Sequence, residues 1–445
     1  MLNALIQALK SKELRKRIYF TLFAFLIFKI MTYIPVPLTD PEVVKNLETV
    51  TLFGFADALS GGALKRFSIV ALGVSPYITA SIVIQLLEMD IIPVLAEWSK
   101  EGETGRQKIN QVTRYTSLAL AFIQSLAMAI GFDKYYGGAL LIPVNVTPFM
   151  WVYIALVMTA GTGATLWLAD QITIKGVGNG TSMIIMAGIV ASFPYMINDL
   201  VTKYIIGFDS SGNVNKGIKN WVMVTDPKQL IIFILVILVM IAIIIAVIFM
   251  QNATRKIPIH YANRPGTLAG QKDSHLPIKL NPSGVIPVIF ASSLLSLPLT
   301  IASFLPAGSK WASTLNTIFN YNQPIGFILY IVLIYLFSFF YAFVQISPEK
   351  VAENLKKQAS YIPSVRPGKE TENYISGVLI RTTVIGSTYL MLVAIIPILF
   401  TMFTTIPRSV EIGGTSLLIV VGVAQELFAQ IEAKTKQQRY SGFIK

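Results

Sequence analysis

Long apolar runs recur along the whole chain, and this feature limits the possible fold more than any other. A helix rises about 1.5 Å per residue, so a run of about 18 to 20 residues can cross about 30 Å of hydrocarbon. The composition agrees, because 54% of the 445 residues are hydrophobic and only 13% are charged, whereas a soluble domain carries about a quarter charged residues. The sequence therefore predicts an all-α polytopic membrane protein.

Ten segments are apolar enough to be predicted as membrane spans. They are residues 18–34, 67–87, 115–130, 149–168, 180–197, 230–250, 282–305, 325–344, 382–403 and 414–428. The first has the charge pattern of a signal peptide, but no small-residue cleavage site follows it, so we expect it to be retained. An even number of spans places both termini on one side. Of the 36 Lys and Arg residues, 25 lie on that side and 10 on the other, which predicts cytoplasmic termini.

The spans divide the chain near its middle, with five before and five after an external loop. Transporter folds are often built from two such halves of inverted topology. We expect the following parts: an N-terminal half over 1–205, an external loop over 206–228, a C-terminal half over 229–428 and a basic cytoplasmic tail over 429–445. The predicted cytoplasmic loops 251–281 and 345–381 far exceed the usual helix connection of about 2 to 8 residues. We interpret both loops as docking surfaces.

Residues that could carry catalysis are scarce in the predicted spans. Away from the span ends, Lys29 is their one ionisable side chain, and we expect it to extend its ammonium to the nearer headgroups. The chain has no Cys, and its two histidines, His260 and His275, lie in one loop without the spacing of a metal site. We predict no active site, metal or cofactor, and therefore no enzyme.

The stretch ALGVSPYITASIVIQ, residues 71–85, places unusual polarity inside an apolar span. At 100° per residue, Val74, Ile78, Ser81 and Gln85 share a sector of about 60°, which becomes polar toward the cytoplasm. Polar groups are costly in lipid, so this face is predicted to form a vestibule that closes on an apolar neck. Alternatively, the polar side chains bond to packed helices or to carbonyls freed by a kink at Pro76.

A shorter apolar stretch precedes this span. Residues 51–67, TLFGFADALSGGALKRF, are interrupted by Gly54, Gly61 and Gly62 and are too few to cross the bilayer. Such a segment is tolerated at membrane depth only where protein or a cavity surrounds it. We expect a re-entrant or interfacial element, and a movable stopper is one interpretation.

Six long motifs, in matching order and covering nearly the whole chain, resemble those of the bacterial SecY family, the channel subunits of the general protein translocase. The motifs are GGALKRFSIVALGVSPYITASIVIQLL, LAEWSKEGETGRQKINQVTRYTSLALAFIQS, DQITIKGVGNGTSMIIMAGIVASFP, SHLPIKLNPSGVIPVIFASSL, AENLKKQASYIPSVRPGKET and GGTSLLIVVGVAQELFAQIE. The resemblance implies a clamshell of two pseudo-symmetric five-helix halves with a short re-entrant plug, hinged between spans five and six. It opens sideways to lipid between spans two and three and spans seven and eight.

The resemblance also implies a function and a set of partners. Members of this family translocate unfolded secretory proteins across the cytoplasmic membrane and release transmembrane segments sideways into its lipids, without hydrolysing ATP themselves. The implied partners are the SecE and SecG subunits, the SecA motor ATPase, the ribosome, and secretory and membrane protein substrates.

Site residues follow from the motif positions. The implied pore ring is Val74, Ile78, Thr181, Ile185, Ile289 and Ile419. Thr181 departs from the bulky apolar residue common in the family, and its hydroxyl is expected to weaken the seal. The implied plug covers about 52–64, with Leu52, Phe53, Phe55, Leu59 and Leu64. Docking of SecA and the ribosome is implied for Arg255, Lys256, Arg366, Pro367, Gly368 and Lys369. Ser81 and Gln85 are expected in the vestibule or the lateral gate.

One alternative belongs to another functional class. An ion-coupled secondary transporter of a small solute would also have ten spans in two halves. It would require an acidic residue, a histidine or a broken helix near the midplane of the membrane. The spans offer no such acidic residue or histidine away from their ends.

Overall fold

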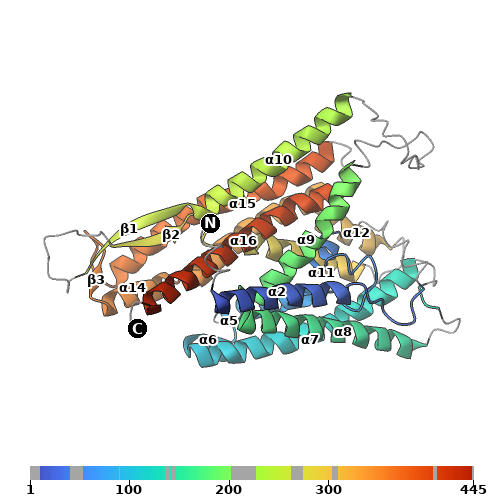
Figure 1. The fold of residues 1–445 in the computed structure, drawn as a ribbon, viewed down its shortest axis with the longest axis horizontal. Helices are drawn as coiled ribbons and strands as arrows, with labels where there is room; N and C mark the ends of the chain where they lie inside the picture. Colours follow the sequence, from blue (N-terminus) through green and yellow to red (C-terminus); the bar gives the residue numbers. More distant parts are fainter. Residues whose placement is uncertain are drawn as a thin grey trace.

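The computed structural model describes residues 11–40, 54–89, 91–135, 140–142, 147–201, 227–261, 274–302, 309–403 and 408–442 (Figure 1). In the part of the chain before residue 202, the described helices are α2 (Lys12–Met31), α4 (Gly54–Leu59), α5 (Ser75–Glu88), α6 (Pro93–Lys100), α7 (Glu103–Tyr135), α8 (Pro148–Lys175) and α9 (Gly180–Val201). The predicted hinge loop 206–228 lies almost wholly outside the described residues.

The second part of the chain adds helices and three strands. They are α10 (Pro227–Asn252), β1 (Thr254–Tyr261), β2 (Ser274–Lys279), α11 (Ile286–Ala302), α12 (Lys310–Phe319), α13 (Pro324–Gln345), α14 (Pro348–Lys357), β3 (Ser360–Tyr361), α15 (Lys369–Phe403) and α16 (Arg408–Gly442). Each predicted span coincides with a helix, and several helices run well beyond the apolar segment. The helix α16, for example, continues through most of the predicted tail.

Within the described residues, seven helices are long and apolar enough to cross a membrane, or eight if the bent pair α5 and α6 counts as one span. The seven are in α7, α8, α9, α10, α13, α15 and α16. The remaining predicted spans correspond to α2, α5 and α11, whose helical apolar stretches are shorter. By length and composition the described helices therefore do not confirm the count of ten.

The second predicted span, 67–87, is not helical before Ser75. Ser68 forms an isolated bridge with Pro35, residues 69–74 form turns, and α5 begins only at Ser75, with Val74 as its N-cap. Pro76 therefore lies in the first turn and produces no kink. This position suits proline, because its fixed φ matches the helix and its missing N–H has no partner to lose there. Residues 282–285, before α11, are turns in the same way.

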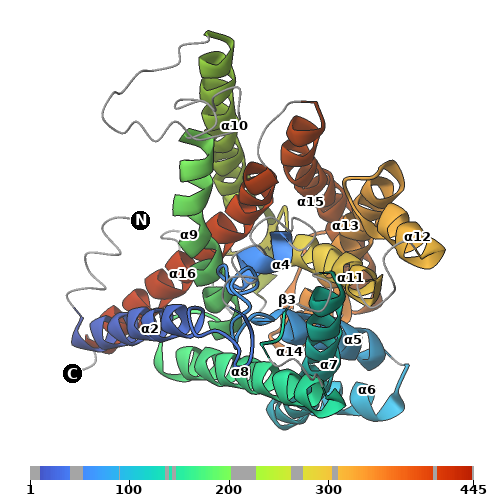
Figure 2. The same ribbon diagram turned by 90° about the vertical axis from the view of Figure 1, so that its right-hand side faces the viewer.

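The helices pack in two groups that meet along two seams. Before residue 202, α7 packs against α5 and α8, while α2 and α9 also pack against α8. After residue 226, α11, α13, α15 and α16 pack in sequence, and α10 packs on α16. The groups touch where α9 meets α16 and where α5 and α7 meet α11. Figure 2 shows the short helix α4 near the middle, and it contacts α9, α11 and α16.

A small antiparallel sheet with the order β2-β1-β3 joins the two long loops predicted to be cytoplasmic. In β1, Ile257 and Ile259 are buried and alternate with exposed Lys256, Pro258 and His260, as a strand with one covered face requires. The buried face packs with α14 and α15 residues in one cluster. Figure 1 shows the sheet at one end of the molecule, beside α14. These strands were not expected from the sequence.

Candidate functional site

Five of the six predicted pore-ring residues lie in one apolar cluster. Val74, Ile78, Ile185, Ile289 and Ile419 are all buried, with at most 7% of any of them exposed. They come from four elements that are distant in sequence: the start of α5, α9, α11 and α16. Aliphatic side chains offer no hydrogen bonds, so a cluster of this kind resists the passage of water and ions.

The sixth residue, Thr181, is held differently. Its hydroxyl donates to Oδ1 of Asn179 (2.7 Å), and its backbone N–H donates to the same oxygen (3.1 Å). Thr181 is half-buried in the first turn of α9, one turn before Ile185. The hydroxyl thus has a local partner at the end of the helix, and the apolar cluster does not include this residue.

A cavity of about 630 Å³ borders the ring. Ile185, Ile289 and Ile419 contribute to its wall. The polar part of the wall is rich in carboxamides, with Asn179, Gln251, Asn281, Gln345, Gln425 and Gln430. Lys279 and Glu426 are the charged residues in this wall. A weakly charged polar space that ends on aliphatic side chains can hold water and an extended polar chain without selecting one sequence.

Ser81 and Gln85, predicted for the vestibule or lateral gate, do not line this cavity. Instead, Nε2 of Gln85 donates to Oγ of Ser81 (3.1 Å), and both side chains are half-buried on α5. Thr79 donates to the carbonyl of Ser75 (3.2 Å), one turn back. Both contacts lie within α5, one turn apart, and reach neither a packed helix nor a carbonyl freed by Pro76.

The predicted plug contains the helix α4. Leu59 is buried in the same apolar cluster as the ring, and Leu64 is buried in a second cluster with Phe67 and Phe132. Phe55 belongs to α4, although its side chain lies outside the described residues, as do Leu52 and Phe53 entirely. The described part of the segment, from Asp57 to Leu64, is therefore largely buried in the interior of the molecule.

The plug segment sits directly against the backbone of α9. Gly61 has a φ of +72°, a conformation that favours glycine, and a Cβ there would lie 3.1 Å from Cα of Gly188. A Cβ on Gly188 would lie 2.7 Å from the carbonyl oxygen of Leu59. The two glycines allow a close approach of plug and helix that no larger residue permits without a shift.

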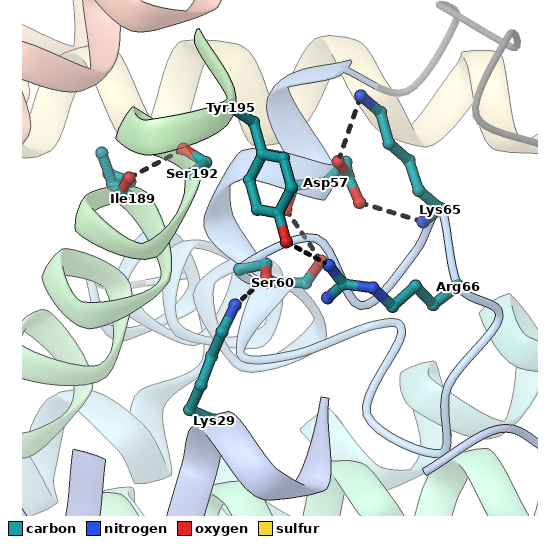
Figure 3. Close-up of polar contacts among 9 residues, drawn as sticks. Lys29, Asp57, Ser60, Lys65, Arg66, Ile189, Ser192 and Tyr195 are labelled. Carbon is teal, nitrogen blue, oxygen red and sulfur yellow. Dashed lines mark hydrogen bonds and ion pairs between the residues drawn. The ribbon is translucent and has the colours of Figure 1, made fainter. Parts of the chain in front are cut away.

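Polar contacts add to this packing (Figure 3). The Lys29 ammonium donates to the carbonyl of Gly61 (3.2 Å), so it turns toward the plug rather than extending to headgroups as the sequence suggested. The backbone N–H of Lys65 donates to Oδ1 of Asp57 (3.0 Å), and the Lys65 ammonium lies 3.9 Å from Oδ2. Burial raises the pKa of the Asp57 carboxyl, while its bonds to Lys65 and the charge of Arg66 oppose that rise.

Arg66 contacts two aromatic rings from other elements. Its Nη2 donates to the hydroxyl of Tyr195 (2.9 Å), and its guanidinium carbon lies 4.2 Å from the centre of the Tyr33 ring. Sequence reasoning missed Asp57, Arg66, Tyr33 and Tyr195. The adjacent cations Lys65 and Arg66 after a Gly-Gly pair gave a signal, but nothing in the sequence pointed to a partner 129 residues away.

The predicted docking residues lie on exposed parts of the two long loops. Arg255 and Lys256 are exposed on β1, and Arg366 and Pro367 are exposed in the turn before α15. The list is completed by Gly368, whose φ is +105°, and by exposed Lys369, the first residue of α15. The hydroxyl of Thr371 donates to the carbonyl of Arg366 (2.8 Å), which fixes the turn. Because β1 pairs with β3, five residues before Arg366, both groups belong to one folded unit.

The described residues contain no group of three or more His, Cys, Asp or Glu side chains that could hold a metal ion.

Comparison with known proteins gives a consistent result. A family model described as SecY matches residues 68–428. The protein translocase subunit SecY of Halalkalibacterium halodurans is 45% identical over 447 residues, covering all of both chains. A solved SecY channel, whose plug domain is described as stabilising the closed state and maintaining a membrane seal, matches with a TM-score of 0.62, 18% identity and coverage of 95% and 92%. Sec61 from a canine ribosome–channel complex matches with a TM-score of 0.58, 16% identity and the same coverage.

Proposed function

The chain belongs to the SecY family, and from this membership we infer that it is the protein-conducting subunit of a translocase. It is a multi-pass membrane protein and not an enzyme. It moves unfolded secretory proteins across the membrane and releases transmembrane segments sideways into lipid. The alternative of a secondary transporter is not supported, because the family and the structural neighbours are protein-conducting channels.

One observation carries the proposed mechanism most directly. Five aliphatic residues from the start of α5, α9, α11 and α16 share one buried cluster, and three of them also border a polar cavity. We propose that this cluster is the pore ring and that the cavity is the vestibule through which a chain reaches it. Aliphatic side chains grip without fixed hydrogen-bond partners, so many sequences can slide past while water is largely held back.

Lateral release follows from partitioning. In the centre of a membrane, each Leu or Ile gains about 0.3 to 0.6 kcal/mol, whereas each Lys or Asp costs about 2.5 to 3.5 kcal/mol. A segment of about 20 apolar residues therefore favours lipid once the seam between α5 or α7 and α11 opens, while a polar segment continues through the ring. The contact of α5 and α7 with α11 supports this position for the gate.

The finer assignments of place and partner are also proposals. The excess of Lys and Arg on one side supports a bacterial cytoplasmic membrane protein with both termini in the cytoplasm. The likeness to a channel from a ribosome complex supports ribosome docking on the sheet and turn that carry Arg255, Lys256 and Arg366. Association with SecE, SecG and SecA follows from family membership.

The ring assignment can be tested by ion conductance. Replacing Ile289 and Ile419 together with Ser should raise the conductance of the resting channel in planar bilayers, because hydroxyls would let water enter the ring. The same change at Ile245, which is 62% exposed on α10, is the matched control and should leave conductance unchanged. Wild-type conductance in the double variant would contradict the ring assignment.

Contact with a passing chain is tested separately. The protein has no Cys. A single Cys introduced at residue 289 can therefore carry a photoreactive group without labelling of other residues in the chain. A secretory chain stalled in transit should crosslink to position 289 but not to position 245. Failure to crosslink while the chain is protected inside the channel would show that the path lies elsewhere.

A further inference from the structure

We propose that Arg66, Tyr33 and Tyr195 form a clamp that positions the plug and so sets how readily the channel opens. This inference rests on the proposed role of residues 54–64 as a plug beside the pore ring. It assigns a positioning role to three residues that do not belong to the ring. The name clamp is used below for these three side chains together.

The clamp joins three separate segments through one side chain. Arg66 lies two residues after Leu64, where the chain leaves the plug, whereas Tyr33 lies just beyond the end of α2 and Tyr195 lies on α9. Besides its bond to the Tyr195 hydroxyl (2.9 Å), the guanidinium carbon lies 4.2 Å from the Tyr33 ring centre and 5.8 Å from the Tyr195 ring centre. A planar guanidinium can stack on an aromatic ring and donate a hydrogen bond at the same time, and an ammonium cannot reproduce this geometry.

The remaining plug contacts show what the clamp adds. Leu59 packs in the ring cluster and Gly61 packs on Gly188, so the inner end of the plug segment is held by shape and burial. Lys29, which lies 5.2 Å from the Tyr33 ring centre, donates to the Gly61 carbonyl. Arg66 holds the chain just after the plug, at residues 65–66. A plug that moves away from Gly188 must pull these residues away from both tyrosines.

The clamp is suited to reversible opening rather than to permanent closure. Tyr33 and Tyr195 are 53% and 55% exposed, so neither ring is enclosed by packing that would lock Arg66 in place. In the described part of the chain, Nη1 of Arg66 is buried without a hydrogen-bond partner, and it would gain water when residues 65–66 move. The closed clamp therefore gains a hydrogen bond and a cation–π contact while leaving one donor unsatisfied, and the net preference for closure is modest.

The main test is the resting conductance of the intact translocase in planar bilayers. Arg66→Gln, which loses the charge and both ring contacts, should raise the open fraction about tenfold. Tyr195→Phe, which keeps the ring and loses the hydroxyl, should raise it about two- to threefold because the site is exposed. Arg66→Lys should fall between the wild type and Arg66→Gln. Tyr153→Phe, at an exposed tyrosine of α8, should match the wild type.

Three further measurements distinguish loss of the clamp contacts from a general loss of stability of the variant protein. Arg66→Gln should also relax the need for a strongly apolar signal segment in export. The double variant Arg66→Gln, Tyr195→Phe should leak no more than Arg66→Gln alone, because both changes break one contact. In the pair Arg66→Cys, Tyr195→Cys, a flexible bismaleimide should restore low conductance, whereas it should not do so in either single variant.

The outcomes separate this inference from the proposed function. Deletion of residues 54–64 and the double Ser variant of Ile289 and Ile419 both test the channel itself. If these two variants leak while Arg66→Gln and Tyr195→Phe conduct as the wild type does, the clamp is overturned and the channel assignment stands. If deletion of 54–64 leaves conductance unchanged, the plug assignment fails and the clamp fails with it. Crosslinking of the Cys pair without any fall in conductance would also overturn the clamp.

Discussion

At the scale of single residues, the absence of a side chain at Gly188 determines how closely the proposed plug approaches α9. A Cβ there would meet the carbonyl oxygen of Leu59 at 2.7 Å and the backbone nitrogen of Gly61 at 3.0 Å. Both are backbone atoms, which cannot rotate away as the end of a flexible side chain can. The plug and α9 therefore fit together only because residue 188 has no Cβ.

We predict that Gly188→Ala displaces the plug. The added methyl should cost about 1 to 3 kcal/mol in the closed state, because the neighbouring backbone must move. Resting conductance should rise, and thermal unfolding should show little change, since the open arrangement relieves the clash. Gly377→Ala is the matched control, because a Cβ at that helical glycine would meet nothing within 4 Å. Equal conductance in both variants would contradict the close fit.

The positions of buried apolar residues were easier to predict from the sequence than the partners of polar and charged side chains. Five predicted ring residues are buried in the same large apolar cluster, which is compatible with a ring, and the ring itself stays a prediction from the family motifs. Lys29 was misjudged, since its preference for headgroups was argued without knowing that the Gly61 carbonyl lies 3.2 Å away. Contacts between segments far apart in sequence, such as Arg66 with Tyr195, depend on tertiary packing that local patterns do not encode.

At the scale of elements, helix positions were predictable and their ends were not. Apolar runs located the helices of the ten predicted spans but not α6, α12 or α14. Of the located helices, α5 starts at Ser75 because Pro76 favours the first turn, and α15 starts at Lys369, well before its apolar part. The sheet was missed because β1 and β2 are short strands within one loop and their third partner, β3, comes from the other loop. The alternation of Ile257 and Ile259 with exposed residues was visible in the sequence, yet a strand needs its partner before it can be recognised.

The folded loop unit leads to a prediction about Arg366. Its guanidinium stands exposed on a turn fixed by Thr371, where it suits bidentate pairing with carboxylates of a partner protein. Arg366→Glu should reduce SecA-driven export at least tenfold, since a buried pairing would become a repulsion. The amount of membrane-inserted protein should stay the same.

The control for Arg366 is another exposed cation of the same loop. Lys350→Glu on α14 makes the same kind of substitution, outside the predicted docking residues. Export at the wild-type rate in Arg366→Glu, measured with purified SecA and membrane vesicles, would remove Arg366 from the docking surface.

At the scale of the whole molecule, two groups of helices meet along two seams, and these seams have different consequences. The contact of α9 with α16 joins helices that carry Ile185 and Ile419 of the proposed ring, whereas the contact of α5 and α7 with α11 is the proposed lateral gate. A passing chain can therefore be held at the ring while its apolar segments meet lipid at the side. Sorting by polarity is a property of this arrangement rather than of any one residue.

This arrangement predicts the fate of a test segment of 20 apolar residues. Replacing its two central Leu residues with Lys should cost about 5 to 7 kcal/mol in the membrane and redirect the segment from insertion to export. Protease protection in membrane vesicles measures the two fates. The same substitutions at the segment's ends should have little effect, because Lys can reach the headgroups there. An equal effect at centre and ends would argue against partitioning as the sorting step.

The helix α9 takes part in the contacts of the proposed ring, the proposed plug and the proposed clamp. It carries Ile185 of the proposed ring, Gly188 as the seat of the proposed plug, and Tyr195 of the proposed clamp. At 100° per residue, the three positions fall within about 80° of one another, on one face along nearly three turns. A small rotation of α9 would therefore move all three positions together. Release of the ring, the seat and the clamp should accordingly be simultaneous, and the channel should switch between shut and open rather than pass through a graded series of apertures.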